Sequence, residues 1–169
     1  MHTTAELIGN GAGIGTAAQA GKYLTFVTGA EEYGLPVLKV REIIKMMEIT
    51  TVPQAPPCVR GVINLRGKVI PVTDLRLKFG LPPQDATDQT CIIVVEVAAG
   101  SRKTMMGLLV DGVSEVLNLQ AKEIEEPPAF GGSMRMDYMR GLAKIKGTVK
   151  ILLDIDRVMI GGEVDGLAA

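Results

Sequence analysis

Hydrophobic and polar residues alternate along residues 59–66, and a period of two is typical of a strand with one buried face. Val59, Gly61, Ile63 and Leu65 would share one face, and Arg60, Val62, Asn64 and Arg66 the other. Gly67 permits a tight turn because it has no Cβ, and residues 69–73 predict a returning strand. Pro71 cannot donate to a β-ladder, so we expect an edge strand or a bulge there.

An internal repeat predicts the fold class. Residues 60–75, RGVINLRGKVIPVTDL, match residues 140–155, RGLAKIKGTVKILLDI, at five of sixteen positions with a constant offset of 80. Residues 33–43 match residues 106–116 with an offset of 73. Short strands without long helices between them favour small barrels over a parallel sheet. We therefore predict an all-β protein with two small barrels of about five strands each, which arise by duplication and enclose a groove between them.

Short helices are expected after the second strand of each repeated hairpin. Asp74 and Asp154 stand where a helix N-cap is needed, directly before LRLKF and IDRVM. The pair Asp154 and Asp156 is therefore interpreted as cap and first-turn residues rather than as an acid–base pair. Glu31 and Glu32 are interpreted as a solvated turn, because neighbouring residues of a strand point to opposite faces.

The ends of the chain differ from its centre in composition. Residues 8–21 are rich in Gly and Ala and lack an apolar pattern, so we expect residues 1–21 to form a disordered tail. Gly13, Gly15 and Ala18 fit a loose dinucleotide-binding fingerprint, but no strand precedes them to place a pyrophosphate. Two interleaved barrel subdomains are expected over residues 22–160, with a boundary near residues 80–90, and residues 161–169 are expected to form a C-terminal tail.

Composition argues against several functions. The net charge of −1 and the six aromatic residues, three Tyr and three Phe, do not favour nucleic-acid binding. The one histidine, His2, lies in the predicted tail, so no His-based triad or metal site is expected. Cys58 and Cys91 lack a His partner and fit a reducing compartment as inert thiols. We therefore predict no catalytic residue, no metal and no cofactor.

No targeting or membrane-spanning segment is evident. The N-terminus has no basic region followed by a long apolar stretch, and no run approaches the ~20 apolar residues of a membrane span. Binding to other proteins is the remaining class of function, since small barrels offer strand edges and apolar patches. The candidate exposed apolar anchors are Val40, Val62 and Phe130.

Four motifs together resemble the CheW family of bacterial chemotaxis adaptors. They are EEYGLPVLKVREI, VRGVINLRGKVIPVTDLRLKFGL, MGLLVDGVSEVL and GLAKIKGTVKILLDIDRVM, which follow one another in the expected order between residues 21 and 160. The resemblance implies two intertwined SH3-like barrels. It also implies a non-enzymatic adaptor that couples the cytoplasmic tips of transmembrane chemoreceptors to the histidine kinase CheA. Such an adaptor would be cytoplasmic, at membrane-associated receptor arrays, without inserting into the membrane itself.

The resemblance also implies roles for individual residues. The receptor contact would lie in the groove between the barrels, at Val40, Glu42, Asn64, Leu65 and Arg66. The kinase contacts would lie around Arg60 and Val69, and at Phe130 in the IEEPPAF loop. Two features depart from the family pattern: the Gly- and Ala-rich tail is longer than the family needs, and Glu125 and Glu126 make the loop acidic. The alternatives are the same scaffold in a different array, such as one that controls pili, or an enzyme.

The composition of the tail leads to a first prediction. Deletion of residues 1–20 should leave the melting temperature and kinase binding nearly unchanged, because this stretch has too few apolar residues to dock. Thermal denaturation of the full-length and truncated proteins measures this directly. A large drop in melting temperature on truncation would show that the tail packs on the barrels.

Overall fold

The computed structural model describes residues 20–126 and 138–158, and strands dominate this part of the chain. The predicted C-terminal tail and all but the last two residues of the predicted N-terminal tail lie outside the described residues. The strands are β1 (Gly21–Thr28), β2 (Glu31–Pro36), β3 (Val40–Lys45), β4 (Val59–Leu65), β5 (Lys68–Asp74), β6 (Cys91–Ala99), β7 (Arg102–Val110), β8 (Gly112–Leu119), β9 (Ile124–Glu125), β10 (Met139–Ile145) and β11 (Thr148–Leu153). The helices are short: η3 (Val37–Lys39), α2 (Leu75–Lys78), η4 (Ala121–Glu123) and α3 (Ile155–Val158).

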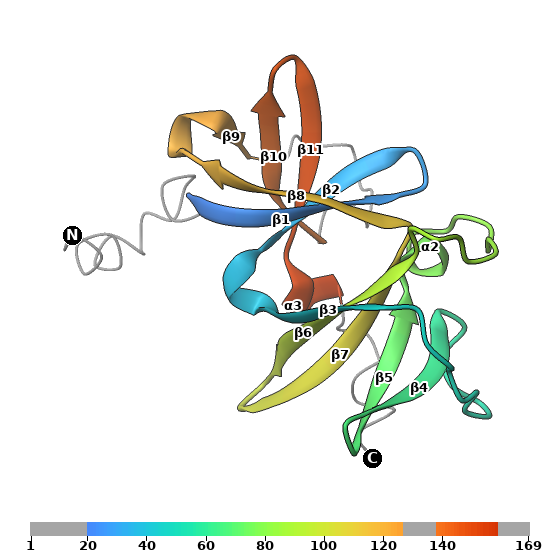
Figure 1. Cartoon of the computed structure of the whole chain (residues 1–169). Helices are drawn as coiled ribbons and strands as arrows, with labels where there is room; N and C mark the ends of the chain where they lie inside the picture. The colour runs from blue at the N-terminus through green and yellow to red at the C-terminus, as the bar shows by residue number, and fades with distance from the viewer. Residues whose placement is uncertain (1–19, 127–137, 159–169) are drawn as a thin grey trace.

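The strands form two sheets, each curled into a small barrel (Figure 1). The terminal barrel has the strand order β8-β1-β2-β11-β10-β9, and the central barrel has the order β3-β6-β7-β5-β4. The chain passes from the terminal to the central barrel at η3 and returns at Asp111, between β7 and β8. Residues 80–90, where the sequence placed a boundary, instead connect α2 to β6 within the central barrel.

The two barrels share one topology, and each contains strands from both copies of the repeat. In the two sheet orders, β3-β6-β7-β5-β4 occupies the same places as β8-β1-β2-β11-β10. The hairpin β4–β5 comes from the first copy but pairs with β7 from the second, whereas β10–β11 from the second copy pairs with β2 from the first. The predicted all-β fold of two SH3-like barrels with short helices is therefore confirmed, and the duplication is expressed as an exchange of strands.

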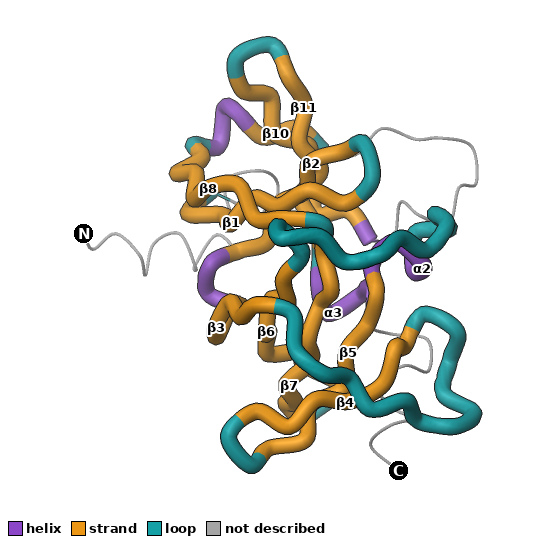
Figure 2. The backbone as a smooth tube through the Cα atoms, turned by 45° about the vertical axis from the view of Figure 1, so that its right-hand side comes forward, coloured by secondary structure: helices purple, strands orange, loops and turns teal. Residues whose placement is uncertain are grey.

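Within the described residues, buried apolar side chains form three clusters. One cluster, with Ile63, Val72 and Ile92, lies inside the central barrel, and a smaller one, with Tyr23 and Leu152, lies inside the terminal barrel. The third and largest cluster combines residues of both sheets with α2 and α3 and therefore joins the barrels to each other. Figure 2 shows α2 and α3 at the level where the two barrels meet.

The hairpin β4–β5 largely follows the predicted alternation, but the position of β5 in the sheet differs from the prediction. Gly61 and Ile63 are buried on one face as expected, whereas Val59, which is also buried, pairs with Thr73 and lies on the other face. The prediction that β5 is an edge strand was wrong, since β5 lies between β7 and β4. Pro71 is tolerated because it pairs with Val62, whose N–H and C=O both bond to Thr50 instead, and because the ladder with β7 begins only at the next residue.

A bulge does occur in this hairpin, on β4 and not at the proline. The register between β4 and β5 shifts between Val59 and Gly61, which leaves Arg60 as the extra residue. The register between β10 and β11 shifts in the same way around Arg140, the counterpart of Arg60. A bulge redirects the side chain of its extra residue, so both arginines are turned away from the regular face of their strand.

Closure of the central barrel depends on a close approach of two backbones. Thr50 and Val62 exchange two backbone hydrogen bonds of 2.8 and 2.9 Å, and these bonds connect the segment after β3 to β4. Gly61 lies beside this contact with a φ of 146°, and a Cβ there would stand 2.1 Å from the carbonyl oxygen of Thr50. Only glycine fits, for reasons of both conformation and space.

The second prediction concerns this closure. Gly61→Ala should lower the free energy of unfolding by at least about 3 kcal/mol, because the backbone of Thr50 must move. Gly67→Ala is the matched control: its φ is also positive, but nothing lies within 4 Å of the added Cβ, so about 1 kcal/mol is expected from strain alone. Chemical denaturation compares the two. Equal losses of stability would show that the contact with Thr50 does not hold the barrel closed.

Candidate protein-binding site

The residues expected to meet a receptor come from both edges of the central sheet. Val40 and Glu42 lie on β3, Asn64 and Leu65 lie on β4, and Arg66 begins the turn after β4. β3 and β4 are at opposite ends of the strand order, and closure of the barrel brings them together. The structure therefore collects these five positions along the line where the barrel closes.

An ion pair between Glu42 and Arg66 spans this line. Nη1 of Arg66 donates to Oε2 of Glu42 at 3.1 Å, and Nη2 donates to the second carboxylate oxygen, which makes a forked contact. The Arg66 side chain is 69% exposed and that of Glu42 31%, so both charged groups are open to a partner. The hydrogen bonds from Arg66 hold the pKa of Glu42 below its ordinary value and raise the pKa of Arg66.

The backbone at Arg66 is in an uncommon conformation. Its φ is 52° and that of Gly67 is 89°, which is the pattern of a two-residue turn with two left-handed positions. Asn and Gly are preferred at such positions, and an arginine there is strained. Asn64 supports the turn, since its Oδ1 accepts a hydrogen bond of 2.9 Å from the backbone N–H of Gly67.

The remaining predicted receptor residues are tied to the interior. Leu65 packs against the cluster inside the central barrel, and Val40 packs against the cluster between the barrels. Both are partly buried. Glu42 and Arg66 thus present charge, whereas Val40 and Leu65 pack against the core and the exposed Asn64 holds the turn at Arg66.

The predicted kinase-contact residues have different surroundings. Val69 is 69% exposed and has an apolar side chain, as a docking residue requires. Nη1 of Arg60 donates to Oδ2 of Asp74 at 2.8 Å, and this aspartate is only 3% exposed. Oδ1 of Asp74 also accepts from the backbone N–H of Arg76 at 2.9 Å, which confirms Asp74 as the N-cap of α2. Phe130 lies outside the described residues.

Sequence reasoning missed several exposed apolar residues that the repeat could have revealed. Val149 is 51% exposed and is the counterpart of Val69 at the offset of 80. Ile43 and Val116 are 45% and 55% exposed, and they correspond at the offset of 73. Leu38 in η3 is the most exposed, at 87%. Because the same positions are exposed in both copies, the repeat itself was the available signal.

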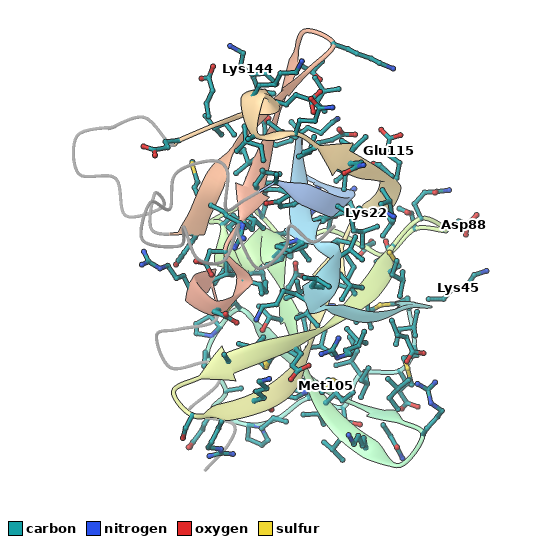
Figure 3. All side chains as sticks on the ribbon, turned by 90° about the vertical axis from the view of Figure 1, so that its left-hand side faces the viewer. Lys22, Lys45, Asp88, Met105, Glu115 and Lys144 are labelled. Carbon is teal, nitrogen blue, oxygen red and sulfur yellow. The ribbon has the colours of Figure 1, made fainter. Side chains whose placement is uncertain are left out.

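The equivalent edge strands of the two barrels differ in charge. On β3 the exposed residues are Arg41, Ile43 and Lys45, whereas the exposed stretch of β8 is Ser114, Glu115 and Val116. Figure 3 shows Lys45 and Glu115 on the surface, away from the sheets that carry them. The exposed apolar residue thus has Arg41, which pairs with Glu96, and Lys45 as its exposed charged neighbours on β3, whereas its counterpart on β8 follows Glu115.

The described residues offer little for other kinds of site. Residues 20–126 and 138–158 hold no group of three potential metal ligands. Cys58 and Cys91 are both buried, and burial raises the pKa of Cys91 above its ordinary value, which opposes reactivity. In the same part of the chain, no helix has the length and apolar character needed to cross a membrane.

The fold and this surface define a double-barrel scaffold, and comparisons with known proteins identify its family. The CheW-like domain model matches residues 22–161. The chemotaxis protein CheW of Klebsiella aerogenes is 36% identical over 143 residues, 85% of this chain and 84% of that protein. CheW of Rhizobium meliloti is 33% identical over 135 residues, 80% of this chain and 84% of that protein. The chain belongs to the CheW family.

A solved structure supports the same assignment. The crystal structure of the scaffolding protein TtCheW from Thermoanaerobacter tengcongensis superposes with a TM-score of 0.74 at 32% identity. The matched region covers 85% of this chain and 95% of the TtCheW chain.

The third prediction follows from the electrostatics of the Glu42–Arg66 pair. A carboxyl with a lowered pKa in the folded state contributes stability above its unfolded pKa of ~4.3, and this contribution is lost as the pH falls through the folded value. Arg66→Gln should therefore return the Glu42 pKa toward the ordinary value, as measured by a carbon-detected NMR titration. Lys68→Gln, in the same hairpin, is the control and should leave it nearly unchanged. An unaltered Glu42 titration in Arg66→Gln would contradict the ion pair.

Proposed function

We propose that this protein is a non-enzymatic adaptor that couples the cytoplasmic tips of chemoreceptors to the histidine kinase CheA. It would act in the cytoplasm, at membrane-associated receptor arrays. The observation that carries this proposal is the exposed Glu42–Arg66 pair with the exposed Val69 nearby in the same hairpin, on a scaffold of the CheW family. Chemotaxis is the process for which the relatives from Klebsiella and Rhizobium are named.

The receptor is proposed to bind along the closing line of the central barrel. A guanidinium and a carboxylate that are already paired can each accept a second partner on their exposed sides, so a helix with both charges could dock in a fixed register. The partly buried Val40 and Leu65 would border the charged pair with apolar surface. Most of the specificity would come from the charges, since exposed ion pairs add little affinity.

The kinase is proposed to bind at the tip of the β4–β5 hairpin. Val69 supplies an exposed apolar contact there. Arg60 contributes indirectly, because its contact with Asp74 holds the base of the hairpin against α2. A second contact is proposed at Phe130, which follows β9 in the sequence, within the motif IEEPPAF. The prolines 127 and 128 before it would limit the entropy lost on docking.

Two barrels of one topology suit an adaptor with unlike partners. The edges β3 and β8 occupy the same place in their sheets but carry opposite charge, which lets each barrel select a different surface.

The fourth prediction tests the kinase contact. Val69→Glu should abolish binary binding to the kinase, because a charge would be buried against an apolar patch. Val149→Glu makes the same change at the equivalent position of the terminal barrel and should spare binary binding. Isothermal titration calorimetry with the purified kinase measures the affinity of both variants. Arg66→Ala, at the proposed receptor contact, should weaken receptor coupling and keep the affinity for the kinase.

The proposed contact at Phe130 is tested by the assembly of arrays with receptors and not by the affinity for the kinase alone. Phe130→Ala should spare binary kinase binding yet disrupt larger arrays when receptors are present. If Val69→Glu binds the kinase as tightly as wild type, the proposed kinase surface is wrong. If Phe130→Ala leaves arrays intact, the second contact does not exist.

A further inference from the structure

A hollow of about 160 Å³ lies beside η3 and is lined by residues of η3, β3, β6 and the start of β7. The cations that line it are Lys39, Arg41 and Lys103. Arg41 pairs with Glu96, and Nζ of Lys103 lies 3.9 Å from the same carboxylate. Because three lining cations face a single lining carboxylate, the hollow attracts anionic groups.

An exposed apolar side chain borders these cations. Leu38 lines the hollow and is 87% exposed. The cations are accessible as well, since the side chains of Arg41 and Lys103 are 46% and 74% exposed. A leucine among accessible cations suits a segment that carries both carboxylates and an apolar residue.

Helix α3 ends beside this hollow. Asp156 of α3 accepts hydrogen bonds from Nζ of Lys39 at 3.1 Å and from the backbone N–H of Ala98 at 2.9 Å, and both donors belong to residues that line the hollow. Asp156 brings the carboxylates to two, so the three cations still leave one positive charge in excess. α3 ends at Val158, and residue 159 therefore follows within about 5 Å of Asp156 along the helix axis.

The sequence that follows α3 has the complementary composition. Residues 159–169, MIGGEVDGLAA, contain two acidic residues and no basic one. In an extended chain, successive side chains alternate, so Glu163, Asp165 and Leu167 would share one face. Glu163 stands five residues beyond α3, and five extended residues span up to about 17 Å, which is enough to cross a hollow of this size.

We propose that residues 163–167 of this same chain dock on the hollow, with their two carboxylates against its cations and Leu167 against Leu38. Each exposed ion pair adds little. The short tether, however, gives the segment a high effective concentration, so a weak contact is still populated and remains reversible. The docking itself does not depend on the adaptor function.

Docking would cover part of β3. Arg41 lies between Val40 and Glu42 in the sequence of this strand, and those two residues belong to the proposed receptor contact. The segment would therefore compete with a partner that binds along β3. This consequence rests on the proposed function, whereas the experiment below contains no receptor and tests the docking alone.

The experiment measures paramagnetic relaxation in the full-length protein with a nitroxide attached to Ala169→Cys. Cys58 and Cys91 are buried, and wild-type protein treated with the same reagent controls for their labelling. The amide signals of residues 38–41 and 102–104 should lose most of their intensity at low salt. They should recover at roughly 1 M salt, where the screening length falls to about 3 Å.

The tip of the β10–β11 hairpin provides the internal reference, because it lies at the far end of the terminal barrel (Figure 1). The amide signals of residues 144–149 should keep their intensity throughout. Equal losses at this tip and at the hollow, or no loss at the hollow, would overturn the proposal.

Two double variants test the role of the carboxylates. Glu163→Gln with Asp165→Asn should abolish the loss of signal at residues 38–41 and 102–104. Asp85→Asn with Asp88→Asn is the control, since it removes the same charge from exposed residues that do not line the hollow, and it should preserve the loss. A loss that survives in the first variant would contradict the docking of the acidic segment.

Discussion

Each sheet is complete only because a strand from one copy of the repeat pairs in parallel with a strand from the other. β2 meets β11, and β7 meets β5, at the equivalent residues Gly34 and Gly107. A Cβ at either glycine would stand 2.8 Å from a side chain of the facing strands, Leu152 or Ile92. Each sheet therefore contains strands from both copies, and the largest cluster combines residues of both sheets. The positions of the exposed residues, including the Glu42–Arg66 pair, depend on that shared core.

The sequence was sufficient for the fold class and for the hairpins, because alternation and turn residues are local signals. It could not reveal which strands pair in parallel, since such contacts join residues far apart in the chain. The bulges at Arg60 and Arg140 were missed for a related reason: an extra residue on one strand is visible only against its partner. Arg60 was consequently placed on the same polar face as Arg66, whereas the bulge turns it toward Asp74.

The two bulged arginines show how duplicated positions diverge without loss of the fold. Arg60 donates to the buried Asp74, but Nε of Arg140 donates to the hydroxyl of Tyr23 at 3.1 Å. Burial raises the pKa of that tyrosine, and the nearby arginine opposes the rise. Both arginines thus satisfy a buried oxygen, one charged and one neutral. The sequence placed Arg60 on a polar face as a kinase contact, and it revealed neither of these two partners.

Strain at the hairpin tips separates the demands of folding from those of binding. Arg66 and Lys146 occupy equivalent turns with φ of 52° and 51°, where glycine or asparagine would be more comfortable. A long cationic side chain does not stabilise the left-handed backbone conformation of such a turn. In the first copy it reaches Glu42 across the closing line of the barrel, so the strained position fixes a charge at a defined place. Residues in unfavourable conformations persist where the surrounding structure holds them in place, and at Arg66 that support includes the forked contact with Glu42 and the bond from Gly67 to Asn64.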